Sequence, residues 1–60
     1  MPYEKVIEFC KKEGISVHVF EKESGLGNGT VRGWKNGSPR LGSLEKAASR
    51  MRITVKDLLE

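Results

Sequence analysis

Residues 17–36 read VHVFEKESGLGNGTVRGWKN and carry the strongest structural signal in this chain. An apolar anchor, Phe20, is followed by Gly25 and then by an apolar pair, Val31 and Trp34. One apolar helix face therefore ends at a glycine, and another begins a few residues later. This is the spacing of two short helices joined by a tight turn, the helix-turn-helix. Gly25 suits the left-handed position just past a helix end.

The residues after this glycine predict how the second helix packs. We expect Leu26 to fill the angle between the two helices. Val31 and Trp34 lie three positions apart, so they share one face and hold the second helix against the body of the domain. The opposite face then points outward, where it is free to enter a DNA major groove.

The length of the chain, 60 residues, predicts one small domain over residues 1–60. So short a chain buries only roughly 60% of its unfolded surface, and a helical bundle is the economical way to build its core. A catalytic cleft or a cofactor pocket would be hard to house. The Ser, His and acidic residues show no triad-like order, and no Cys/His spacing suits zinc. We therefore expect no enzyme, no cofactor, no metal and no small-molecule substrate.

Cysteine use and hydropathy predict the compartment. The single cysteine, Cys10, cannot form an internal disulfide, which suits a reducing cytoplasm. The first residues, MPYEK, include an acid and lead into no apolar run, so they do not resemble a signal peptide. No segment approaches the ~20 apolar residues that span a bilayer. We expect a soluble cytoplasmic protein without a membrane partner.

Basic side chains are concentrated in the second part of the chain. Residues 1–24 hold four Lys and five Glu, a balance of −1, whereas residues 25–60 hold seven Lys or Arg and three acids, a balance of +4. No acid lies between Glu23 and Glu45, while Arg32, Lys35 and Arg40 fall inside that gap. An acid-free segment over the second helix of the motif suits a surface that binds a polyanion.

Apolar periodicity predicts an all-α fold of five helices, at about residues 3–13, 17–24, 28–36, 43–51 and 55–59. Ser16 and Thr54 are expected to cap the second and the fifth helix, with Asp57 in the first turn of the latter. The expected core consists of Val6, Phe9, Cys10, Val17, Phe20, Leu26, Val31, Trp34, Leu44, Ala47, Ala48, Met51, Ile53, Val55 and Leu58.

The third helix is weak by propensity. Gly29 and Gly33 would lie inside it, and each costs roughly 1 kcal/mol relative to Ala. Asn28 or Gly27 would cap it, and packing of its apolar pair must hold it in place. The loop that follows is expected to turn Leu41 inward.

Several short motifs occur in order along nearly the whole chain, at the spacing typical of one known protein family. They are GIS at residues 14–16, SGL at 24–26, GTVRGWKNG at 29–37, SPRL at 38–41 and ITVKDLL at 53–59. Together they resemble the helix-turn-helix domains of the lambda-repressor/Cro type, the Xre family. The sequences of these motifs are most similar to those of small repressor or Cro-like proteins of Gram-positive phages. The resemblance implies a compact five-helix DNA-binding domain with the motif at the second and third helices.

The chain departs from the family pattern at four positions. Glu21 stands where the family has a small residue, so either it reaches solvent or the second helix packs differently. Val17 replaces a glutamine that contacts phosphate in the family. Arg52 replaces a glycine at the end of the fourth helix, where it must adopt a left-handed conformation or change the turn. Gly42 stands where the family has a helix former or a cap.

The outward face of the third helix supplies the candidate DNA contacts. Asn28 and Arg32 are the expected base readers, because Asn pairs with adenine and Arg with guanine. Backbone phosphates would be contacted by Thr30, Lys35, Asn36, Ser38 and Arg40. Gly29 and Gly33 either let the backbone approach the groove closely or leave the helix with few side chains that can contact bases. Two readers per domain suggest a homodimer on a two-fold site, with half-sites ~34 Å apart.

Other residues have ordinary structural interpretations. His18 is expected to face solvent, Cys10 to fill the core and Trp34 to pack in the core rather than stack on a base. Two functions remain open. The first is a DNA-binding transcriptional regulator that reads double-stranded operator DNA. The alternative is an antirepressor or modulator that binds a partner phage repressor through the exposed surface of residues 28–37.

Overall fold

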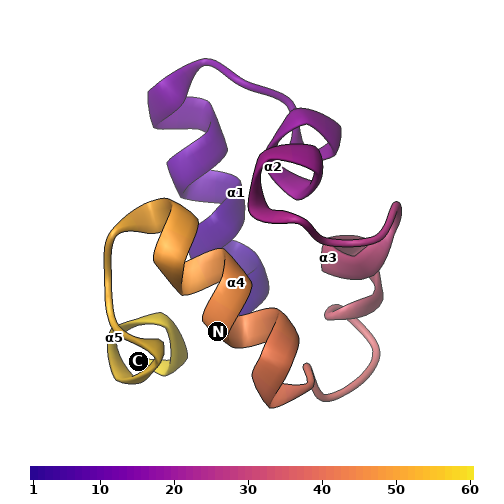
Figure 1. The fold of residues 1–60 in the computed structure, drawn as a ribbon, viewed down its shortest axis with the longest axis vertical. Helices are drawn as coiled ribbons and strands as arrows, with labels where there is room; N and C mark the ends of the chain where they lie inside the picture. The colour runs from indigo at the N-terminus through magenta and orange to yellow at the C-terminus, as the bar shows by residue number, and fades with distance from the viewer.

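The computed structural model describes all 60 residues and contains five helices and no strand. The helices are α1 (Pro2–Glu13), α2 (Val17–Ser24), α3 (Thr30–Gly33), α4 (Leu41–Met51) and α5 (Val55–Leu59). Figure 1 shows α2 and α3 on one side of α1 and α4, with α5 and the C-terminus on the other. The fold is therefore a small all-helical bundle in which α3 and the loop after it form one edge.

Capping residues set the bounds of α2 and α5. The Ser16 side chain accepts a hydrogen bond from the Val19 N–H at 3.1 Å, as expected of an N-cap. Thr54 and Asp57 form a reciprocal capping box at the start of α5, with the Asp57 N–H donating to Thr54 Oγ1 at 3.0 Å. Gly25 ends α2 in the left-handed conformation, with φ at 78°. These three predictions from the sequence are confirmed.

The core is a cluster of nine buried side chains drawn from all five helices. Phe20 at its centre packs edge to face with the half-buried Phe9, with ring centroids 5.8 Å apart. Leu26, between α2 and α3, packs against the same cluster. The nine are Val6, Cys10, Phe20, Val31, Trp34, Leu44, Ala47, Ala48 and Leu58. All nine belong to the core predicted from apolar periodicity.

Three expectations about α3 and α4 are wrong. The third helix covers only Thr30–Gly33, and its N-cap is Gly29 rather than Asn28 or Gly27. The fourth helix begins two residues earlier than expected, at Leu41, because the extended Arg40 after Pro39 serves as its N-cap. Leu41 is 63% exposed instead of turned inward. It lies in the first turn of α4 and is not among the residues packed on the core.

Arg52 ends α4 in the left-handed conformation, with φ at 60°. It is the only residue other than glycine with a positive φ. Of the two outcomes expected at this position, the chain therefore keeps the turn and carries the strain, which costs roughly 1–2 kcal/mol for an L-residue.

None of the five helices has the length and apolar composition needed to cross a bilayer.

Candidate nucleic-acid interface

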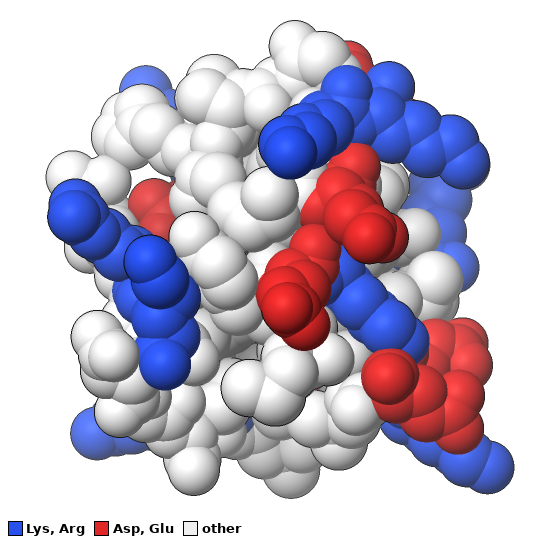
Figure 2. Space-filling model, turned by 180° about the vertical axis from the view of Figure 1, so that it is seen from behind, with Lys and Arg blue, Asp and Glu red and all other residues white.

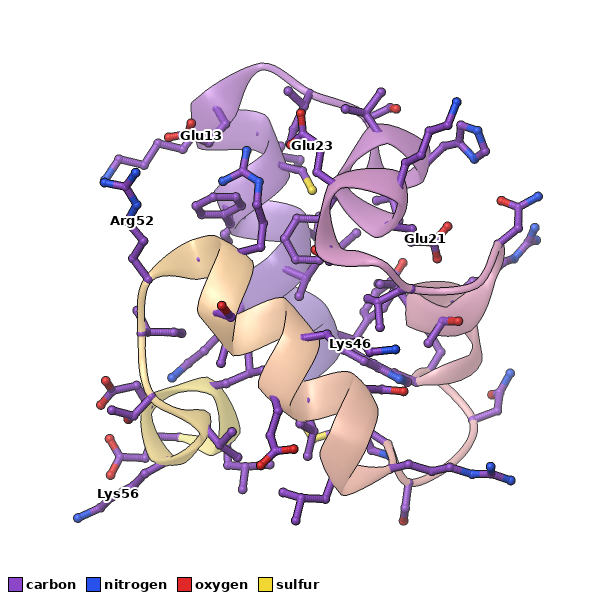
Figure 3. All side chains as sticks on the ribbon, viewed as in Figure 1. Glu13, Glu21, Glu23, Lys46, Arg52 and Lys56 are labelled. Carbon is purple, nitrogen blue, oxygen red and sulfur yellow. The ribbon has the colours of Figure 1, made fainter.

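Glu21 of α2 organises the turn that leads into α3. Its side chain is only 4% exposed. One carboxylate oxygen, Oε2, accepts a hydrogen bond from the Val31 N–H at 2.9 Å, and the other, Oε1, accepts from the Gly29 N–H at 3.2 Å. Figure 3 shows Glu21 directed from α2 toward the segment that enters α3. Of the two expectations for this position, exposure to solvent is wrong, because Glu21 is buried and joins α2 to the start of α3.

This carboxylate uses the backbone donors at the start of α3. The first N–H groups of a helix have no partner inside it and attract anions. Here Glu21 takes two of these donors, and the Thr30 N–H donates to the Gly27 carbonyl at 3.1 Å. Three of the four donors at the start of α3 are therefore engaged, and the Arg32 N–H alone has no backbone or side-chain acceptor. An anion that approaches this surface must be met mainly by side chains.

The two glycines of the α3 region have different structural roles. Gly29 has φ at 85°, a conformation in which a side chain is strained, and this conformation points its N–H at Glu21. Gly33 is the exposed last residue of α3 and has a negative φ, and a Cβ there would meet no atom within 4 Å. The turn therefore requires a glycine at residue 29 but not at residue 33.

The two candidate base readers are both exposed, but they lie in different local structures. Arg32 is on α3 and makes no hydrogen bond or ion pair through its side chain. Asn28 lies in the turn before α3, and its Oδ1 is 2.9 Å from Nδ1 of His18 on α2. His18 is exposed, as expected, but it is not merely solvated, because it contacts one of the candidate readers.

The five candidate phosphate contacts fall into two groups. Asn36, Ser38 and Arg40 are exposed and have no side-chain hydrogen bond. The other two already have partners. The Thr30 hydroxyl is half-buried and donates to the Gly27 carbonyl at 2.7 Å, so its proton is engaged. The Lys35 ammonium lies 5.6 Å from the centroid of the Tyr3 ring, a weak contact that an approaching phosphate can replace.

The charges around α3 are unbalanced. Arg32, Lys35 and Arg40 form no ion pair, whereas Arg50, on the far part of α4, pairs with Glu23 at 2.8 Å. In Figure 2 the acidic side chains gather mainly over the centre and the right of the molecule. The left edge, where α3 lies in this view, shows basic side chains with acidic atoms set back behind them. The surface over α3 and the loop after it is therefore basic.

Sequence reasoning missed three residues that shape this surface. Glu21 and His18 act through partners eight to ten positions away. Lys46 of α4 extends toward the α2–α3 turn in Figure 3, where its ammonium donates to the Gly25 carbonyl at 3.4 Å. An acid next to the buried anchor Phe20 was the one available signal, and it marks Glu21.

Two other kinds of reactive group could carry chemistry, the thiol of Cys10 and any cluster of metal-binding side chains. Cys10 is buried, and this desolvation raises the pKa of its thiol above the ordinary value. The charge of Arg50 opposes this rise in pKa, while the charge of Glu21 adds to it. The thiol is therefore held in its unreactive protonated form. No group of three or more His, Cys, Asp or Glu side chains is placed to hold a metal ion.

Comparison with known protein families, with characterised proteins and with solved structures finds no match to this chain.

Proposed function

We propose that this protein is a lambda-repressor/Cro-like transcriptional regulator that binds double-stranded DNA, with α2 and α3 as its helix-turn-helix. The order of elements supports this proposal. A short helix ends at a left-handed glycine, a tight turn follows, and the next helix buries Val31 while it leaves Arg32 in solvent. These are the features by which such a motif presents its second helix to the major groove.

The observation that carries the proposal is the basic, acid-free segment from residue 28 to residue 40. Six of its seven candidate contact residues are exposed, and only Thr30 is half-buried. Its three cations have no carboxylate partner. Free cations on an exposed edge lower the free energy of binding to a polyanion by releasing its counterions.

Within this interface the residues divide by chemistry. Arg32 and Asn28 would contact base edges, which specify sequence. Lys35, Asn36, Ser38 and Arg40 would contact phosphates, which position the domain without reading sequence. Thr30 would contribute less as a donor, since its hydroxyl proton is already engaged. With two readers per domain, we expect a homodimer on a two-fold site in the cytoplasm.

The test is a titration of isotope-labelled protein with a mixed-sequence 20-base-pair duplex at low salt, followed through backbone amide shifts. We expect shifts concentrated in residues 28–40 that disappear as salt rises. Arg40→Ala should reduce the slope of log affinity against log salt by about 1, the effect of losing one phosphate contact. Lys56→Ala removes an exposed cation from α5, on the opposite side of the bundle, and should leave the slope unchanged.

Two outcomes would contradict the proposal. The first is an absence of shifts in residues 28–40 at millimolar DNA. The second is an equal loss of affinity in Arg40→Ala and Lys56→Ala, which would indicate diffuse attraction rather than a defined interface. The first outcome would favour the alternative function, an antirepressor that binds a partner repressor, and titration with that class of protein would follow.

A further inference from the structure

The contact between His18 and Asn28 joins α2 to the turn before α3. His18 Nδ1 and Asn28 Oδ1 are 2.9 Å apart, a normal hydrogen-bond distance, although the two residues are ten positions apart in sequence. Both side chains are exposed. They share the rim of a shallow hollow with Glu21, Lys22 and Leu26. Through Asn28 the contact therefore adjoins the surface that the proposed function assigns to DNA.

The chemistry of the pair fixes which atom donates. An amide oxygen only accepts hydrogen bonds, so Nδ1 of His18 must carry the proton in this contact. The amide of Asn28 is then held with its oxygen toward α2 and its NH2 group away from α2. If the proton were on Nε2 instead, Nδ1 would be an acceptor and the Asn28 amide would have to turn over.

We propose that His18 is a positioning residue that fixes the orientation of the Asn28 amide and thereby sets the base that Asn28 prefers. This inference rests on the proposed DNA-binding function. The NH2 group held away from α2 contains two donors and no acceptor. It is complementary to guanine, which presents the acceptors N7 and O6 in the major groove. The pairing with adenine expected from the sequence also needs the amide oxygen as an acceptor, and His18 holds that oxygen. Cytosine presents only the N4 amino donor there and is rejected.

The orientation of the pair can be tested without DNA. A long-range proton–nitrogen NMR spectrum of the free protein identifies which ring nitrogen of neutral His18 carries the proton. We expect protonated Nδ1 in the wild type, and a shift toward the tautomer mixture of free imidazole in Asn28→Ala. A predominance of the Nε2–H tautomer in the wild type would overturn the inference, whatever the protein binds.

The base preference is tested by selection from a duplex library with a randomised core, with the enriched duplexes then measured as G·C and C·G versions at each position. We expect one position at which the wild type prefers G·C by about 5- to 150-fold, the discrimination of one good side-chain contact to a base. In His18→Ala this ratio should fall to near one. The salt dependence, which phosphate contacts set, should stay the same.

Two charged variants separate positioning from a general structural effect. His18→Lys presents only donors, so it should hold the Asn28 oxygen and keep the preference for G·C. His18→Glu presents only acceptors, so it should turn the amide over and reverse the preference toward C·G. Val19→Ala changes an exposed neighbour on α2 that has no polar group, and serves as the matched control.

The outcomes distinguish this inference from the proposed function. If no duplex is enriched, the proposed function fails and the base preference fails with it, while the tautomer measurement still decides the geometry of the pair. If duplexes are enriched but His18→Ala, His18→Lys and His18→Glu all keep the wild-type ratio, DNA binding stands and the positioning role of His18 is refuted.

Discussion

Replacement of Glu21 tests whether one buried carboxylate holds α3 in place. The helix has only four residues, and its first donors are satisfied by this side chain from α2. Helix propensity and length alone would not stabilise such a segment. We therefore expect the free energy of unfolding to depend strongly on Glu21, and the order of the candidate interface to depend on it as well.

The size of the effect follows from the two hydrogen bonds. Glu21→Ala leaves the buried Val31 N–H without a partner, at a cost of about 1–3 kcal/mol. It also leaves the N–H of the N-cap residue, Gly29, without its partner, an effect comparable to the loss of a capping side chain, about 0.5–2 kcal/mol. These contributions overlap, so we expect a loss of about 2–4 kcal/mol in the free energy of unfolding. Glu21→Gln keeps the shape and one acceptor oxygen, so its loss should be about 1–2 kcal/mol.

Urea denaturation followed by the fluorescence of the buried Trp34 measures these losses. The matched control is Glu23→Ala, which removes a partly exposed acid of the same helix and should cost no more than about 1 kcal/mol. A domain of this length is stabilised by only about 3–9 kcal/mol, so Glu21→Gln is the variant most certain to remain folded.

Amide hydrogen exchange provides the local measurement. In Glu21→Gln the amides of Gly29 and Val31 should exchange faster relative to the core amides of α1. Equal destabilisation by Glu21→Ala and Glu23→Ala, or unchanged exchange at Gly29 and Val31, would refute the argument that this carboxylate caps α3.

Three further predictions concern stability. Arg52→Gly should raise the free energy of unfolding by about 1 kcal/mol because it relieves the left-handed strain, whereas Arg52→Ala should not. Urea denaturation of both variants tests this, because only Arg52→Gly should have a higher midpoint than the wild type. The raised pKa of the Cys10 thiol means that the unfolded chain loses this proton first, so stability should fall as pH rises above the ordinary thiol range, and Cys10→Ala should lack this component. Leu41→Ser should change stability by less than about 0.5 kcal/mol, against about 2–5 kcal/mol for Leu44→Ala; a smaller difference would place Leu41 in the core.

The bounds of α2 and α5 could be predicted from the sequence because their causes are local. Ser16 and Thr54 each bond to a backbone group three residues ahead, and Gly25 adopts its left-handed conformation without help from distant residues. The core residues could be predicted for a similar reason, since apolar spacing along a helix decides which side chains share a face. The basic segment of the candidate interface, residues 28–40, could be predicted because Arg32, Lys35 and Arg40 lie close together in the chain with no acid among them.

Tertiary structure alone decided how that interface is organised. The start of α3 is bound by Glu21, and Asn28 is bound by His18, through contacts between residues eight to ten positions apart. The exposure of Leu41 likewise depends on what lies beside the first turn of α4 and not on its spacing from Leu44. Periodicity describes which face a residue occupies within its own helix. It contains no information about which polar groups of another element reach that face, because those distances arise only when the helices pack.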